Sequence, residues 1–254
     1  MPDRRRHRGP HPEDESLFGH RQVSVLQQAT ADLSWLLGRR YALPSSLKLV
    51  GDRYQLTARQ RIAVSRSSCS NENRQKRLAS QVSVPEISGH HICVDGYNVL
   101  TSIEVALSGG VLLRGVDGCL RDMASMHGSY RKVAETEPAL RLLGEFLAEI
   151  EVSQCYWFFD EPVSNSGRLR SLMLSLARQY GWNWTVHLVP DPDAVLRETD
   201  QCIATADSEI LNQCGCWINL VREIVTTHLP AAWIVEMAIS THPDRGQSPR
   251  SRFE

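Results

Sequence analysis

Residues 91–101 read HICVDGYNVLT, and the fold class of the chain follows from this stretch. Ile92, Cys93 and Val94 form an apolar run that is typical of a short buried strand, so the chain leaves the core at Asp95. Gly96 and Asn98 supply turn-forming residues directly after it. An aspartate at this position either caps the backbone that follows or serves as a metal ligand or catalytic acid, because parallel sheets build their sites beyond the carboxyl ends of their strands.

Short apolar runs alternate with helical stretches throughout the chain after Pro85. The expected strands are 91–94, 155–159, 184–189, 202–205 and 216–221, and the expected helices are 138–150, 167–180 and 208–213. This alternation indicates βαβ units, so we expect an α/β fold with a Rossmann-like parallel sheet flanked by helices. The polar, glycine-rich segment 101–133 interrupts the alternation and is expected to be an insertion or flap.

The first third of the chain predicts a small helical module rich in arginine. A helix is expected over residues 21–43, closed by Pro44, a second begins with Thr57 as its cap, and a third covers 73–81. The predicted organisation is a disordered tail (1–19), a basic helical module (20–85), an α/β domain (90–235) and a second disordered tail (241–254).

Charge is distributed unevenly over the 254 residues. Residues 1–90 hold 15 Lys and Arg against 8 Asp and Glu, whereas residues 91–230 hold 10 against 18. A basic part beside an acidic one is typical of proteins with an anionic partner, although two solvated faces that attract each other give the same pattern. The seven cysteines form no C-x-x-C pair, and no apolar stretch is long enough to span a membrane, so we expect a cytoplasmic protein without a membrane partner.

Two further expected strands also end at an aspartate. CYWFFDEP leads into Asp160, and CIATADSEIL leads into Asp207. The carboxyl ends of parallel strands share one edge, so Asp95, Asp160 and Asp207 should converge there. Carboxylates that repel one another are held together by hard divalent cations, and Mg²⁺ or Mn²⁺ is therefore the expected cofactor. The alternative is that each aspartate merely caps a helix.

Several motifs resemble known families. VDGYNVL looks like the opening motif of the NYN branch of PIN-like nucleases, and ATADSEIL is similar to their later strand-end motif. Over about residues 15–235 the chain also resembles domain of unknown function family 434, through VGDRYQLTARQRIAVSR, DGYNVL, RGVDGCLRDMASMHGSYR and FFDEPVSNSGRL. The resemblance implies a PIN-type sheet, a divalent-metal site and phosphodiester hydrolysis.

The resemblance assigns roles residue by residue. Asp95 and Asn98 fit the first motif, Asp160 the middle acid and Asp207 the late acid, and these four are the expected catalytic residues. Asp95, Asp160 and Asp207 are the expected metal ligands. Asp193 is the candidate for a fourth acid, although a helix cap explains it equally well; whether it or Asp117 completes the site stays open at this point.

Arginines indicate the expected nucleic-acid partner, since guanidinium groups suit phosphates. The predicted contacts are Arg39, Arg40, Arg53, Arg59, Arg61, Arg66 and Arg121. The segment 114–131 is either a substrate-binding flap, with His127 assisting proton transfer, or an ordered surface loop. Two functions therefore stand: a metal-dependent nuclease, with RNA favoured over DNA, and a non-catalytic RNA- or DNA-binding protein with a PIN-like domain.

Overall fold

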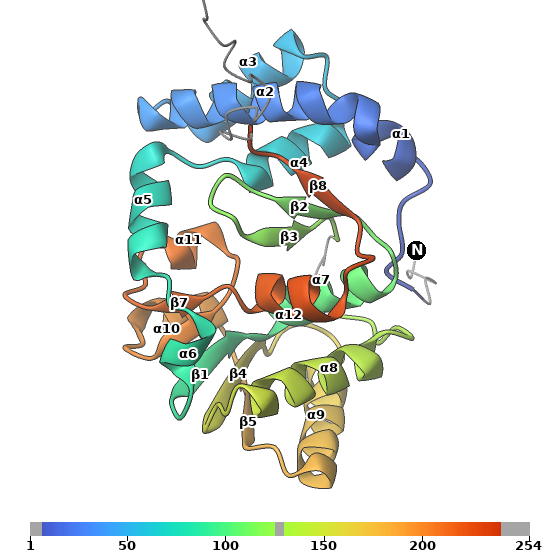
Figure 1. Cartoon of the computed structure of the whole chain (residues 1–254), viewed down its shortest axis with the longest axis vertical. Coiled ribbons are helices and arrows are strands. Elements are labelled where there is room, and N and C mark those ends of the chain that lie inside the picture. The colour runs from blue at the N-terminus through green and yellow to red at the C-terminus, as the bar shows by residue number, and fades with distance from the viewer. Residues whose placement is uncertain (1–6, 125–129, 240–254) are drawn as a thin grey trace, which may run out of the picture.

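A computed structural model describes residues 7–124 and 130–239 of the chain, and a parallel sheet lies at its centre (Figure 1). The five-stranded sheet has the order β5-β4-β1-β6-β7, and every neighbouring pair is parallel. Its strands are β1 (His91–Asp95), β4 (Gln154–Asp160), β5 (Trp184–Val189), β6 (Cys202–Ala204) and β7 (Trp217–Ile218). The predicted Rossmann-like parallel sheet is thereby confirmed.

Helices cover both faces of this sheet. The helices are α7 (Gly96–Leu107), α8 (Thr136–Glu149), α9 (Ser166–Tyr180), α10 (Pro192–Glu198), α11 (Ser208–Leu211) and α12 (Leu220–His228). Ile92, Val94, Trp157 and Phe159 pack among residues of α7, α8, α9 and α12. Because side chains alternate along a strand, Cys93 lies on the opposite face, in a core shared with α10 and α11. The sheet is flanked by helices as predicted.

The chain enters a helix directly after Asp95, where the sequence indicated a turn. Helix α7 begins at Gly96, which adopts helical geometry. A Cβ atom at Gly96 would overlap the ring of Phe159, a buried residue of the neighbouring strand β4. The glycine therefore serves close packing between α7 and the sheet, and the turn expectation was wrong.

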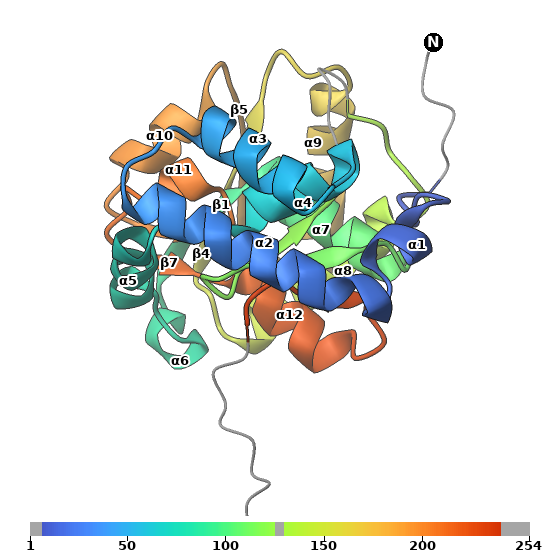
Figure 2. The same cartoon turned by 90° about the horizontal axis from the view of Figure 1, so that it is seen from above.

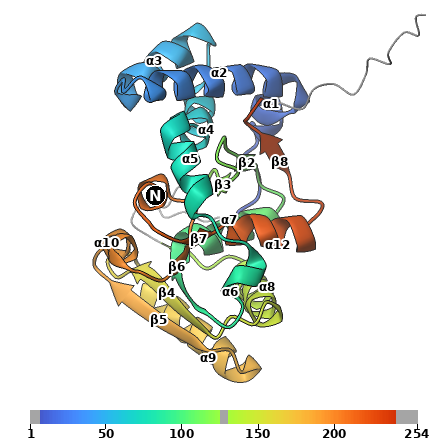
Figure 3. The same cartoon turned by 60° about the vertical axis from the view of Figure 1, so that its left-hand side comes forward.

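The segment 101–133 contributes to a second, smaller sheet. β2 (Leu112–Arg114) pairs antiparallel with β3 (Leu120–Asp122) and parallel with β8 (Ile234–Glu236), which gives the order β3-β2-β8. Figures 1 and 3 both show this sheet between the N-terminal helices and the parallel sheet. Of the expected flap, His127 lies outside the described residues.

The N-terminal part is helical, as expected. Its helices are α1 (Asp14–Phe18), α2 (His20–Gly38), α3 (Leu43–Arg53), α4 (Ala58–Ser67), α5 (Asn71–Ser80) and α6 (Val84–Ile87). Thr57 caps α4 through a reciprocal pair of hydrogen bonds with Gln60, so its predicted role is confirmed. Pro44 lies in the first turn of α3, so it opens a helix and does not close one.

The N-terminal helices share their apolar core with the small sheet. Leu26 and Leu33 of α2 pack in one cluster with Leu113 of β2 and Val235 of β8. Figure 2 shows α2 lying across this end of the molecule. Phe18 of α1 is 1% exposed in the same cluster. The expectation of a disordered tail over residues 1–19 was therefore wrong for α1, because Phe18 gives this segment an apolar anchor.

Among the helices of the described ranges, none has both the length and the apolar composition needed to cross a membrane.

We predict that Gly96→Ala destabilises the protein by about 1–3 kcal/mol, because the added methyl group displaces the Phe159 ring in a packed core. Urea unfolding of the variant measures the change. Gly38→Ala is the matched control, since a Cβ atom there meets no neighbour within 4 Å. Equal loss of stability in both variants would contradict the packing role of Gly96.

Candidate active site at the carboxyl edge of the sheet

Asp95 and Asp160 are the last residues of the neighbouring strands β1 and β4. Asp95 pairs with Phe158, so Asp160 lies two residues further along the adjacent strand. Strand spacing and rise place their Cα atoms about 8 Å apart. Alternation puts both side chains on the face of Cys93 and Phe158, which α10 and α11 cover. The two acids therefore share one edge and one face.

Asp95 is buried, with 9% of its surface exposed, and it is the residue before α7, in an extended conformation. Its carboxylate accepts a hydrogen bond of 2.7 Å from the hydroxyl of Thr205, the residue after β6. Burial raises the pKa of Asp95 to about 7, and the charges of Asp207 and Asp193 act in the same direction. Because its pKa is raised, this carboxylate is poised to take up a cation or a proton.

Asn98 fixes the loop that follows β6. Its side-chain oxygen accepts a hydrogen bond of 2.8 Å from the backbone N–H of Ala206. The next backbone N–H, of Asp207, donates to the Thr205 hydroxyl at 3.0 Å. Asn98 was predicted as a catalytic residue, and the contact that the structure gives it is one that positions Thr205 and Asp207.

The other acids reach the same edge from α10 and α11. Asp207 caps α11, accepting from the backbone N–H groups of Glu209 at 2.8 Å and Ile210 at 3.2 Å. Partial burial raises the pKa of Asp193, and the charges of Asp207, Asp160 and Asp191 raise it further. Burial and Asp191 also raise the pKa of Asp160. Asp193 is therefore electrostatically coupled to the three predicted acids.

Asp191 belongs to this acidic group and was missed by sequence reasoning. It caps α10, with its side chain accepting from the Ala194 N–H at 2.9 Å. Its sequence signal is that of an ordinary helix cap, PDPDAV, in which either aspartate fits. Only the fold reveals that the cap lies beside Asp160.

Asp117 does not complete the acidic group. Its buried carboxylate binds Arg121 at 2.7 Å and Arg77 at 2.5 Å. Burial raises the pKa of Asp117, but the two guanidinium groups have the larger effect together and hold that pKa well below its usual range. Arg121 also donates to the Ala206 carbonyl at 2.8 Å, and therefore anchors the loop that carries Thr205. The assignment of Arg121 to nucleic acid was wrong, because its side chain is 8% exposed and fully engaged.

Tyr97, within the DGYN motif, is a second residue that sequence reasoning did not single out. Its ring packs against Phe159 and Tyr130, with centroids 4.8 and 5.2 Å away. Its buried hydroxyl has no hydrogen-bond partner among the described residues. Burial and the Asp160 charge raise the pKa of Tyr97, which places a neutral O–H donor near that carboxylate.

Most of the predicted nucleic-acid arginines have internal partners. Arg59 forms two hydrogen bonds to Asp14, a residue that is 1% exposed. Arg61 binds Asp52 at 2.8 Å, and Arg66 donates to the Asp122 carbonyl at 2.6 Å. These three side chains join α4 to α1, α3 and the end of β3, which corrects their assignment to phosphate. Arg39, Arg40 and Arg53 lie on the exposed surface, so for them the prediction stands.

The carboxylates of this edge can be compared with the ligands that metal ions prefer. Within residues 7–124 and 130–239, no three His, Cys, Asp or Glu side chains are close enough to ligate one ion. Mg²⁺ does not require such a cage, because it keeps several waters and binds through one or two carboxylates plus substrate phosphates. Hard oxygen donors whose pKa values are raised by mutual repulsion and burial fit such an ion.

Fold and site together define an α/β protein with a parallel sheet, a helical N-terminal region and an acidic carboxyl edge. Residues 84–223, more than half of the chain, match the family described as Domain of unknown function (DUF5616), and the chain belongs to that family. Residues 25–79 match the family described as Protein of unknown function (DUF434). The resemblance to family 434 is thus confirmed for the helical part, while a separate family covers the α/β part.

One curated relative is the uncharacterised protein MJ0935 of Methanocaldococcus jannaschii. It is 25% identical over 186 residues, which cover 73% of this chain and 88% of that protein. No solved structure gives a significant match to the chain.

The raised pKa of Asp95 predicts a pH-dependent stability of the metal-free protein. Between about pH 4 and 7 the unfolded state has lost this proton while the native state retains it. The free energy of unfolding should therefore fall as pH rises through this range, by at most about 1.4 kcal/mol per pH unit. Asp95→Asn should remove that slope. Urea unfolding in chelator from pH 4 to 8 measures it, and parallel curves for both proteins would contradict the burial of the Asp95 carboxyl.

Proposed function

We propose that this protein is a divalent-metal-dependent nuclease with a PIN-like α/β domain, and that RNA is its favoured substrate. The observation that carries the proposal is the convergence of Asp95, Asp160, Asp193 and Asp207 at one edge, with raised pKa values at the first three. Carboxylates whose charges raise one another's pKa values disfavour one another without a cation. The likeness of VDGYNVL and ATADSEIL to NYN-type motifs supports the same conclusion.

In this proposal Asp95, with Asp160, Asp193 or Asp207, holds Mg²⁺ or Mn²⁺. When bound, the ion supplies a Lewis acid that offsets the charge of a phosphodiester and lowers the pKa of water. The acidic edge would otherwise repel a nucleic acid.

The surrounding residues orient these acids. Thr205 fixes one oxygen of Asp95 through its hydroxyl. Asn98 holds the Ala206 N–H and so sets the distance between the loop and the strand end. Tyr97 packs its ring behind the strand ends, and its buried hydroxyl keeps an unused donor there.

In this proposal, the single-stranded RNA binds to the exposed part of the N-terminal helices. Arg39 stacks on Trp35, with the guanidinium carbon 3.5 Å from the ring centroid. Trp35 and Tyr41 are 56% and 58% exposed, so two rings lie open beside Arg39 and Arg40. Exposed rings beside arginines suit the bases and phosphates of single-stranded RNA. The seven free cysteines support a reducing, cytoplasmic setting for this activity.

A non-catalytic RNA- or DNA-binding role is the second candidate. The observation in its favour is that the described residues contain no group of three metal-ligating side chains. In that case the PIN-like domain retains its fold without chemistry, and the surface around Arg39 carries the function.

Cleavage of a labelled single-stranded RNA with Mn²⁺ tests the proposal. We predict that Asp160→Asn lowers the cleavage rate by about 100-fold or more, because a group that stabilises transition-state charge is lost. Binding of the same RNA on filters should change little. Asp200→Asn is the control, since Asp200 is exposed and precedes β6 at the opposite end of the strand.

If the intact protein binds RNA but cuts neither RNA nor DNA, the non-catalytic role replaces the nuclease. If it neither binds nor cuts them, both candidates fail.

A further inference from the structure

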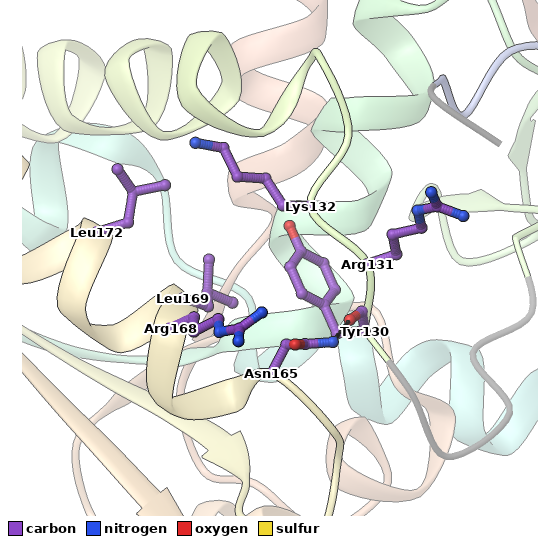
Figure 4. A pocket seen from close by; sticks show the side chains of 7 residues that line it. All are labelled: Tyr130, Arg131, Lys132, Asn165, Arg168, Leu169 and Leu172. Atoms are coloured by element: carbon purple, nitrogen blue, oxygen red, sulfur yellow. Dashed lines mark hydrogen bonds between the residues drawn. The ribbon is translucent and has the colours of Figure 1, made fainter. Parts of the chain in front are cut away.

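A cavity of about 500 Å³ lies between α9 and the segment that precedes α8 (Figure 4). Such a volume suits a small molecule or a single nucleotide. The cavity is lined by Tyr130, Arg131, Lys132, Asn165, Arg168, Leu169 and Leu172. None of these residues belongs to the acidic edge, so the cavity is a separate feature of the molecule.

Three cationic side chains line this cavity without acidic partners. Among the ion pairs of residues 7–124 and 130–239, none involves Arg131, Lys132 or Arg168. Most arginines of the N-terminal helices, in contrast, are paired internally. In Figure 4, Lys132 extends toward the side of Leu172 and Arg168 extends from α9 toward Tyr130, whereas Arg131 extends away from the leucines. Lys132 and Arg168 therefore supply the positive charge of the cavity.

Helix α9 adds its N-terminus to the same wall. Asn165, the residue before α9, adopts a left-handed conformation with φ of 73° and makes no capping hydrogen bond through its side chain. Its side chain donates instead to the Tyr130 carbonyl at 3.0 Å, which ties the two walls together. The first N–H groups of a 15-residue helix carry a partial positive charge that adds to that of Arg168.

Hydrogen bonds of Tyr130 hold the wall opposite α9, and α9 itself supplies the apolar side chains. The Tyr130 hydroxyl donates to buried Glu104 at 2.5 Å and contacts the Thr136 hydroxyl at 3.0 Å. Leu169 and Leu172 give the cavity an apolar side. A preformed cavity with a cation on each wall and two leucines on α9 matches a phosphate attached to an apolar body.

The cavity adjoins the candidate active site. Asp160 ends β4, and α9 begins six residues later at Ser166. Tyr97, whose pKa the Asp160 charge raises, packs its ring against Tyr130 of the cavity wall. Residues 160–166 and the packing of Tyr97 on Tyr130 thus connect the cavity to the carboxyl edge of the sheet.

We propose that this cavity binds a nucleotide that carries a phosphate monoester, with Lys132 and Arg168 contacting the phosphate and Leu169 and Leu172 contacting the base or sugar. The identity of that nucleotide as the phosphorylated end of an RNA strand rests on the proposed function. Binding of the isolated mononucleotide does not, because it needs neither metal nor cleavage.

Titration calorimetry of the metal-free full-length protein with adenosine 5′-monophosphate, adenosine 3′-monophosphate, adenosine and inorganic phosphate tests the proposal. A monophosphate should bind with a dissociation constant below about 1 mM, adenosine at least about tenfold more weakly, and inorganic phosphate between them. The 5′- and 3′-compounds distinguish which end of a strand the cavity accepts. Saturable binding of neither monophosphate up to about 1 mM overturns the proposal.

Lys132→Gln combined with Arg168→Gln should weaken monophosphate binding by at least about tenfold, because two charged hydrogen bonds are lost. Both side chains are exposed, so the fold should persist. Arg170→Gln is the matched control: it is exposed on the same helix and does not line the cavity. Equal weakening in the control would place the ligand elsewhere and overturn the assignment. If the unaltered protein binds the monophosphate but cleaves no nucleic acid, only the nuclease proposal is overturned.

Discussion

The carboxylate of Asp117, buried between two arginines, is the interaction on which the carboxyl edge of the sheet depends. Arg121 binds Asp117 and the Ala206 carbonyl, while Arg77 of α5 binds Asp117 and the side chain of Asn212. One negative charge thereby joins a helix of the N-terminal part, the segment before β3 and the loop after β6. Removing one partner of such a buried pair typically lowers the free energy of unfolding by about 3–5 kcal/mol, because it leaves a buried charge without a partner.

The position of that loop decides the geometry of the acids. Thr205 reaches Asp95 and the Ala206 N–H reaches Asn98, while Arg121 holds the Ala206 carbonyl of the same loop. The N-terminal helices therefore contribute to the candidate site without lining it. The apolar core shared by α2, β2 and β8 is a second contact that holds the N-terminal helices in place. The regions matched by two families of unknown function pack together through both contacts.

Local sequence patterns predicted the parallel sheet well. The apolar runs before Asp95 and Asp160, and the cap at Thr57, depend on neighbours within a few residues, so their signal lies in the sequence. The role of Gly96 depends on the ring of Phe159, and Arg77 depends on a carboxylate 40 residues away. Such partners are fixed by tertiary packing, which is why the small sheet, α1 and the internal roles of Arg59, Arg61 and Arg66 were not predicted.

The central claim is that the acids at the carboxyl edge hold a divalent cation. Manganese scatters X-rays anomalously, so diffraction from a crystal soaked in Mn²⁺ locates the ion directly. The account predicts an anomalous peak within coordination distance, about 2.0–2.2 Å, of the Asp95 carboxylate and of at least one carboxylate among Asp160, Asp193 and Asp207. A crystal that contains Mn²⁺ but shows no peak at this edge would contradict the claim.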